Sequence, residues 1–99
     1  ITGGGIIENL PRILPDSCVA VIQKGSWQIP PIFTFLQEAG KLSKGEMMRT
    51  FNNGIGIILV VPDKITESLQ EFLSAMGEKA YVIGTIAERE TASNQIAWA

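Results

Sequence analysis

Residues 1–12 read ITGGGIIENLPR, so that three consecutive glycines run directly into a segment whose apolar residues have helical spacing. Glycine permits positive φ and lets a ligand approach the main chain with no Cβ in the way. Where such a loop opens a helix, several backbone N–H groups lack intrahelical partners at the positive end of the helix dipole. The stretch predicts a short helix from about Gly5, interrupted near Pro11 and ended before Pro15, with an anion site at its start.

The next part of the chain alternates strand and helix patterns. Residues 18–22 are rich in Val and Ile, as in a strand, and a turn follows at 24–26. Pro31 suits the first turn of a helix that Gly40 closes. Ser43 and Glu46 have the spacing of a capping box, which predicts a second helix ending near residues 52–54. The large apolar residues here are expected in the core: Trp27, Phe33, Phe35, Met47, Met48 and Phe51.

The second half continues the alternation. Residues 55–61 are continuously apolar apart from Gly56, which predicts a central strand buried on both faces. Asp63 can cap an amphipathic helix over 65–76, closed by Gly77. Residues 81–87 predict a further strand, residues 89–94 are polar, and residues 95–99 form a short edge strand or fray. We therefore expect a layered α/β (α+β) fold, with helices packed on a mixed sheet.

Composition limits the classes of function. Ninety-nine residues allow one small domain, and a net charge of −2 gives no basic field for nucleic acid or an anionic membrane. The absence of His and the single cysteine, Cys18, exclude the usual zinc site and an intrachain disulfide. The apolar run at 55–61 is too short to span a bilayer. We expect a cytoplasmic protein with no metal in this segment, whose high apolar content suits a piece normally covered by another.

Three groups of residues could bind a ligand. The first is Thr2 with Gly3, Gly4 and Gly5, a candidate phosphate cradle for which the alternative is a structural turn. The second is Asn9 with Arg12, which a helix places on one face, where Arg can hold phosphate and Asn can pair with an amide. The alternative there is a helix kink with a surface ion pair.

The third group is Arg49, Thr50 and Asn52, at a helix end close to Gly54 and Gly56. Polar residues next to glycines that permit close approach suit a ligand, although Thr50 and Asn52 could simply satisfy the turn. The chain offers no Ser-His or Cys-His pair, and its scattered Glu side chains read as solvated faces. No complete catalytic set is expected in these residues, and a catalytic acid or base is not identified.

The motifs ITGGG, ENLPR at 8–12, Trp27, Ile29-Pro30, Glu46-Met47 and RTFN at 49–52 followed by GIG resemble the aminoimidazole ribonucleotide synthetase family, the phosphoribosylformylglycinamidine cyclo-ligases. The resemblance covers essentially the whole chain. Family members are roughly three times as long, and residues 1–99 match the last part of their second domain. The family places a His just before the matching ITGGG run, and Asn53 stands where many relatives carry a larger apolar residue.

The resemblance implies an ATP-dependent reaction in purine biosynthesis. ATP activates the formyl oxygen of formylglycinamidine ribonucleotide, an amidine nitrogen attacks the activated carbon, and the imidazole ring closes with release of ADP and phosphate. The nucleotide and Mg²⁺ are expected on an N-terminal domain outside this segment, the full-length protein is expected to be a homodimer, and the segment alone is expected to be inactive. The nine residues of the three groups are then expected to bind substrate.

Two other interpretations stay open. One is a different enzyme of the same superfamily, of the selenophosphate synthetase, thiamine-phosphate kinase or hydrogenase-maturation type. These share the domain plan, but the combination of ENLPR at 8–12 with RTFN at 49–52 is not expected in them. The other is a non-catalytic α/β ligand-binding module, whose length and hydropathy would be similar.

Overall fold

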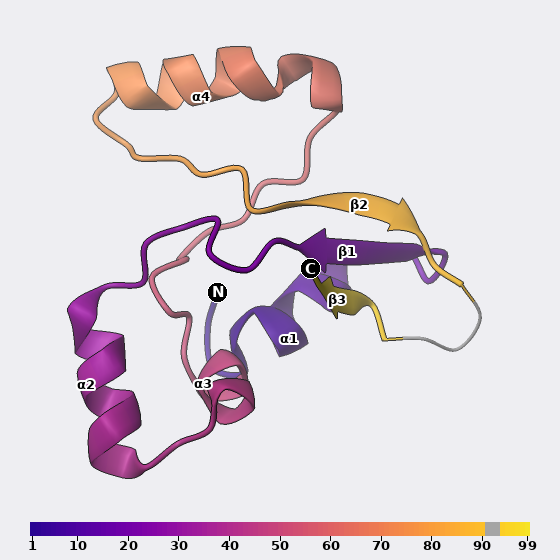
Figure 1. Cartoon of the computed structure of the whole chain (residues 1–99). Coiled ribbons are helices and arrows are strands. Elements are labelled where there is room, and N and C mark those ends of the chain that lie inside the picture. Colours follow the sequence, from indigo (N-terminus) through magenta and orange to yellow (C-terminus); the bar gives the residue numbers. More distant parts are fainter. Residues whose placement is uncertain (91–93) are drawn as a thin grey trace.

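The structure is a computed structural model that describes residues 1–90 and 94–99, and the polar residues 91–93 lie outside the described part. Figure 1 shows the order of its elements along the chain. The α-helices are α1 (Gly5–Asn9), α2 (Pro31–Gly40), α3 (Lys44–Thr50) and α4 (Thr66–Ala75). Two 3₁₀ turns, η1 (Leu10–Ile13) and η2 (Asp63–Ile65), precede β1 and α4 respectively. The strands are β1 (Cys18–Ile22), β2 (Gly84–Glu88) and β3 (Ile96–Trp98).

The sheet is mixed, as predicted, with β1 between its two neighbours. β2 pairs antiparallel with β1, in a register that sets Cys18 opposite Glu88. β3 pairs parallel with β1 and sets Ala20 opposite Ile96. The amide of Ala20 donates to the oxygen of Gln95 across 2.8 Å, so the end of the chain is a paired edge strand rather than a frayed tail.

The core lies between the first helical segment and the sheet. Ile6 and Leu10 lie four residues apart, on one side of the first helical segment. They pack in one buried cluster with Ala20 and Ile22, which lie two residues apart on one face of β1. The buried cluster is completed by Trp27, Ile55 and Ile96. The interruption predicted at Pro11 is confirmed, because α1 ends at Asn9 and continues as a 3₁₀ turn. This packing fixes the position of the glycine loop relative to the sheet.

The helix ends follow their predicted chemistry with two exceptions. Gly40 does not close α2, because it is the last residue of the helix and Lys41 after it takes the left-handed cap conformation, at φ 54°. Ser43 accepts from the amide of Glu46 and the Glu46 carboxylate accepts from the amide of Ser43, which confirms the capping box of α3. At the end of α4, Gly77 has φ 84° and the amide of Glu78 donates to the oxygen of Leu73, which closes the helix. Asp63 makes no capping bond, because it lies inside η2 rather than before it.

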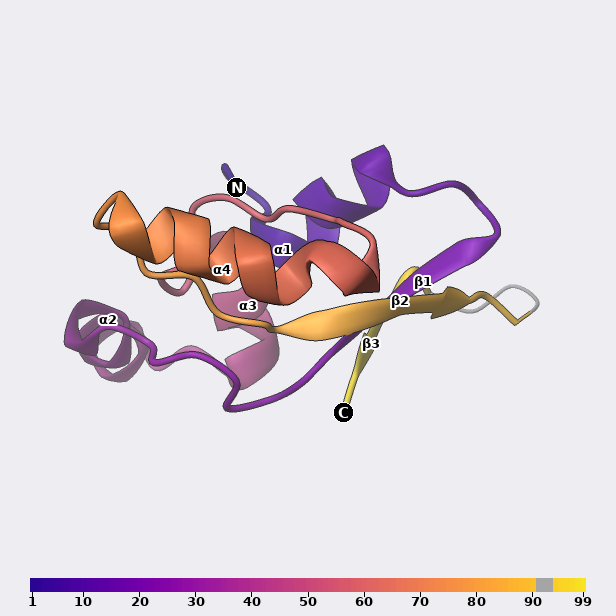
Figure 2. The same cartoon turned by 90° about the horizontal axis from the view of Figure 1, so that it is seen from above.

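The apolar faces of α2 and α4 differ from the expectation. Both helices form, but neither buries a residue, and Phe35 is 63% exposed although we expected it in the core. Phe33 is only partly buried, with its ring 6.0 Å from that of Phe51. Both helices lie away from the sheet, as Figures 1 and 2 show. An amphipathic pattern predicts which face a helix will bury, but the described residues supply no surface that covers it.

The predicted central strand at 55–61 is wrong for this structure. The segment forms no regular secondary structure and pairs with no strand among the described residues, and Ile57 is 82% exposed. Ile55 is buried in the core, and Ile58 is partly buried against it. A buried apolar strand needs neighbours on both edges and cover on both faces, and the three described strands lie elsewhere. The strand predicted over 81–87 begins instead at Gly84, where a Cβ would lie 2.1 Å from the oxygen of Val21.

Candidate functional site

Two of the three glycines in the loop are required by its backbone conformation and packing. Gly4 and Gly5 have φ of 99° and 64°, and a Cβ on Gly5 would lie 2.1 Å from the oxygen of Met48. The backbone of the loop therefore packs directly on the end of α3. Gly3 does not have a positive φ and is exposed. A Cβ at this position would have no heavy atom within 4 Å. Its lack of a side chain is not required by local packing.

Asn9 ties the loop to the helix that follows. Its Nδ2 donates to the oxygens of Gly5, Thr2 and Gly3 at 2.8, 3.1 and 3.3 Å. Its Oδ1 accepts from Thr2 Oγ1 at 3.0 Å and from Arg12 Nη1 at 3.2 Å. The structure thus brings the first two predicted groups together as one hydrogen-bonded cluster, in which Asn9 orients both the loop and the guanidinium.

The third predicted group divides between two places. Asn52 Oδ1 accepts from the amide of Gly54 at 2.8 Å, which is the turn-forming role that we gave as its alternative. Thr50 is exposed at the last residue of α3. Arg49 lines a recess with Ile7 and Pro11, and neither Asn9 nor Arg12 lines that recess. The end of α3 thus touches the glycine loop through its backbone, while the Arg49 side chain lines a recess whose lining does not include Asn9 or Arg12.

We call this second feature the Arg49–Arg89 recess, after the two guanidinium groups that line it. Asn94 and Trp98, from the last segment of the chain, also line it. Sequence reasoning did not single out Arg89, because it lies in a polar stretch with no motif. The signal for it is spatial: the backbone of Arg89 donates to the oxygen of Ser17 at 2.7 Å, which brings residue 89 beside the start of β1.

A buried asparagine was also missed. Asn53 has only 2% of its surface exposed and adopts φ 51°, and its Nδ2 donates to the oxygens of Met47 and Phe51 at 3.0 and 3.1 Å. It caps the end of α3 from the inside, so an amide is the right group at this position. The signal was present in the sequence, since Asn before Gly often takes a left-handed turn conformation.

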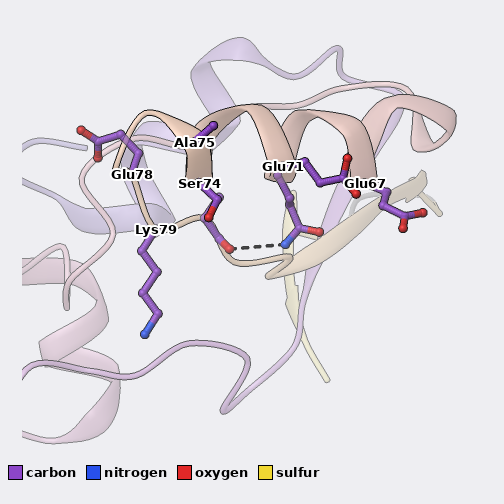
Figure 3. A pocket seen from close by; sticks show the side chains of 8 residues that line it. Glu67, Glu71, Ser74, Ala75, Glu78 and Lys79 are labelled. Atoms are coloured by element: carbon purple, nitrogen blue, oxygen red, sulfur yellow. Dashed lines mark hydrogen bonds between the residues drawn. The ribbon is translucent and has the colours of Figure 1, made fainter.

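A further recess lies beside α4. Gln70 Nε2 donates to the oxygen of Ala80 at 3.3 Å across it, the contact drawn as a dashed line in Figure 3. The carboxylates of Glu67 and Glu78 lie at opposite ends of this recess and point away from each other (Figure 3). Within residues 1–90 and 94–99, no three His, Cys, Asp or Glu side chains are grouped so as to hold a metal ion. This recess offers no convergent chemistry.

The described helices are also too short or too polar to cross a membrane.

The described site residues supply a guanidinium, an oriented amide and a glycine loop at the Asn9 cluster, and two guanidinium groups at the Arg49–Arg89 recess. It contains no nucleophile paired with a base among the described residues. These are binding and charge-stabilising functions rather than a complete catalytic set.

Comparison with known proteins gives the family. The model of the AIR synthase related protein C-terminal domain matches residues 1–95. The chain is 55% identical over 98 residues to the phosphoribosylformylglycinamidine cyclo-ligase of Desulfatibacillum aliphaticivorans, covering 99% of this chain and 28% of that protein. It is 52% identical over 90 residues to the cyclo-ligase of Syntrophus aciditrophicus, and 53% over 90 residues to that of Bacillus velezensis. Each of these matches covers 91% of this chain and 26% of the relative.

The chain thus spans about a quarter of the length of the curated relatives that it matches. The matched family and the mixed sheet agree with the resemblance found in the motifs. The chain belongs to the family of AIR synthase related C-terminal domains.

Proposed function

We propose that residues 1–99 form part of the C-terminal domain of an ATP-dependent cyclo-ligase, and that they supply substrate-binding groups to its active site. The reaction proposed is the cyclisation of formylglycinamidine ribonucleotide to aminoimidazole ribonucleotide, with release of ADP and phosphate. The relatives that share this segment at 52–55% identity carry the cyclo-ligase name. ATP and Mg²⁺ would be held mainly by an N-terminal domain, the full-length protein would be a cytoplasmic homodimer, and this segment alone would not turn over.

The observation that carries the proposal is the cluster around Asn9. One amide side chain holds the carbonyls of the glycine loop through Nδ2 and the guanidinium of Arg12 through Oδ1. A ligand that carries both an anion and an amide or amidine needs such a fixed set of donors. Ring closure between two parts of one substrate depends more on positioning and on stabilisation of charge on oxygen than on a strong base.

Within this proposal the predicted residues have separate roles. Thr2, Gly3, Gly4 and Gly5 would face the phosphate or the activated formyl oxygen, with Gly3 as the point of closest approach because local packing does not require a glycine there. Asn9 would position the loop, and Arg12 would pair with an anionic group. Arg49, Thr50 and Asn52 would border the same site from the end of α3, whose backbone touches Gly5.

The test uses a protein in which residues 1–99 are joined to the ATP-binding domain. We expect Arg12→Ala to weaken substrate binding by about 1.5–3 kcal/mol, the usual worth of a hydrogen bond to a charged group, with little change in stability. The matched control is Lys64→Ala, which removes an exposed positive charge from η2, far along the chain from the cluster. Equal substrate affinity in wild type and Arg12→Ala would make this arginine structural and remove the basis of the proposal.

A further inference from the structure

The turn after α3 contains the one Asn-Gly pair of the sequence, Asn53-Gly54. Asparagine loses its side-chain amide most readily before glycine, because the next backbone nitrogen can attack the side-chain carbonyl carbon with no Cβ to hinder it. The fold nonetheless requires this glycine. Gly54 has φ 99°, and a Cβ on it would lie 2.5 Å from Cδ of Pro30. The chain therefore carries a chemically reactive pair at a position where packing does not allow the glycine to be replaced.

The native structure restrains the side chain of Asn53. Only 2% of the residue is exposed, and its Nδ2 donates to the oxygens of Met47 and Phe51 at 3.0 and 3.1 Å. Cyclisation requires Cγ to reach bonding distance of the Gly54 nitrogen and Nδ2 to leave as ammonia. Departure of Nδ2 breaks both bonds and removes the donor from two carbonyls at a buried helix end, which is unfavourable.

The peptide group that contains the attacking nitrogen is held at both ends. Its N–H, from Gly54, donates to Oδ1 of Asn52 at 2.8 Å. Its oxygen, from Asn53, accepts from the indole N–H of Trp27 at 2.9 Å. An amide nitrogen attacks only after it loses its proton, and a hydrogen-bonded N–H loses its proton to solvent only when the bond opens, as in hydrogen exchange. The folded turn therefore restrains both partners of the reaction.

We propose that Asn53 is a site of spontaneous deamidation, which the folded turn protects and which opening of the turn exposes. In the open turn the Gly54 nitrogen loses its proton and forms a bond to Cγ of Asn53. The bond between Cγ and Nδ2 then breaks, and Nδ2 takes up a proton and leaves as ammonia. Water adds to either carbonyl carbon of the resulting succinimide and opens the ring. The products are aspartate and isoaspartate at position 53.

Neither product can restore the cap of α3. A carboxylate has no N–H to donate to the oxygens of Met47 and Phe51, and its charge would be buried beside them. Isoaspartate also adds a carbon to the main chain. A reversible opening thus becomes a permanent change at the end of α3. The change extends to the glycine loop, because a Cβ on Gly5 would lie 2.7 Å from the same oxygen of Phe51. The inference depends on the Asn-Gly pair and its contacts and not on the cyclo-ligase reaction.

The test follows the 99-residue chain by peptide mass spectrometry at slightly alkaline pH, in buffer and in guanidinium chloride. Fragment masses assign the conversion of amide to acid to Asn52 or to Asn53. We expect Asn53 to react at least about tenfold more slowly in buffer than in denaturant, because reaction in buffer requires local opening. In denaturant Asn53 should react before Asn9 and Asn94, neither of which precedes glycine.

Two variants separate the contacts of the fold from the chemistry of the pair. Asn52→Ala removes the acceptor of the Gly54 amide, and should speed the reaction in buffer about two- to fivefold while leaving the rate in denaturant unchanged. Lys44→Ala is the matched control, since it changes an exposed residue at the other end of α3 and should leave both rates unchanged. Equal rates for the two variants in buffer would show that the bond to Gly54 does not protect the pair.

The product is then compared with the unmodified chain. Deamidated protein, separated by ion exchange on its added negative charge, should unfold at a lower denaturant concentration. The proposal would be overturned if Asn53 reacted equally fast in buffer and in denaturant, or if it did not react in denaturant at all. It would also be overturned if the deamidated and unmodified chains unfolded at the same denaturant concentration. None of these results would bear on the Arg12→Ala test of substrate binding in the longer protein.

Discussion

Trp27 donates its indole N–H to the backbone oxygen of Asn53 across 2.9 Å, and both residues are buried. This bond connects the segment after β1 with the turn after α3. The side chain of Asn53 meanwhile donates to the oxygens of Met47 and Phe51 at the end of α3. A turn sequence of this kind usually tolerates substitution. Here the turn at Asn53 instead connects the end of α3 with buried Trp27 and with the segment that leads to Ile55.

Replacement of Asn53 should be costly. Asn53→Ala removes the donor that serves two carbonyls at the buried end of α3, and it places a residue with a Cβ at φ 51°. An unsatisfied buried polar group costs about 1–3 kcal/mol, and the left-handed conformation costs roughly 1–2 kcal/mol more for most residues. We expect the free energy of unfolding, measured by urea titration, to fall by at least about 2 kcal/mol.

Two variants separate these causes. Asn53→Gly tolerates the positive φ and should recover part of the loss, while still lacking the side-chain bonds. Asn52→Ala, next in the chain, removes only an exposed bond to the amide of Gly54 and should cost less than about 1 kcal/mol. A wild-type unfolding curve for Asn53→Ala would show that the cap contributes nothing.

The glycine loop allows a sharper comparison. Gly5→Ala would place a Cβ 2.1 Å from the oxygen of Met48, at φ 64°, so that α1 and α3 must separate. We expect a loss of more than about 2 kcal/mol in the free energy of unfolding, or failure to fold. Gly3→Ala is the control, since open space surrounds that position and its stability should change by less than about 0.5 kcal/mol. Similar losses at both positions would contradict the packing described here.

Local chemistry could be predicted from the sequence, and contact with distant surfaces could not. The capping box at Ser43 and the stop at Gly77 depend on a few neighbouring residues, and both are confirmed. The prediction of a strand at 55–61 was wrong, because strand formation depends on partner strands elsewhere in the chain. The same limit explains why the prediction that Phe35 is in the core was wrong. Its place on the apolar stripe of a helix does not show which surface would cover it.

The candidate site shows the same division. The link between Asn9 and Arg12 was predictable, because a spacing of three places side chains on one helical face. The place of Arg49 beside Ile7 and Pro11 depends on how α3 packs against α1, and no local pattern encodes it. The pairing of the Arg89 backbone with Ser17 brings residue 89 to the start of β1. No sequence motif marked this position.

The exposed apolar surface predicts self-association of the 99-residue chain. Ile57 and Phe72 are 82% and 62% exposed, and exposed apolar groups of this size favour contact with another surface. We expect the weight-average mass from sedimentation equilibrium to rise with concentration, and Phe72→Lys to reduce that rise. Glu71→Lys, on the same helix, makes a larger change in charge without removing apolar surface, and should not reduce it to the same extent. A strictly monomeric wild-type chain at high concentration would contradict this prediction.

Asn9→Asp should loosen the glycine loop while keeping the contact with Arg12. The carboxylate still accepts from Thr2 and Arg12, but the Nδ2 donor to the oxygens of Thr2, Gly3 and Gly5 is lost. The amide of Gly5, which donates to the oxygen of Thr2, should then exchange with deuterium about tenfold faster, as expected for a loss near 1.4 kcal/mol. Thr2→Val is the control, because it removes one acceptor bond of Asn9 and leaves its three donor contacts in place. If exchange at Gly5 is unchanged in Asn9→Asp, the loop holds its shape through its own glycines and its packing on α3, and Asn9 does not position it.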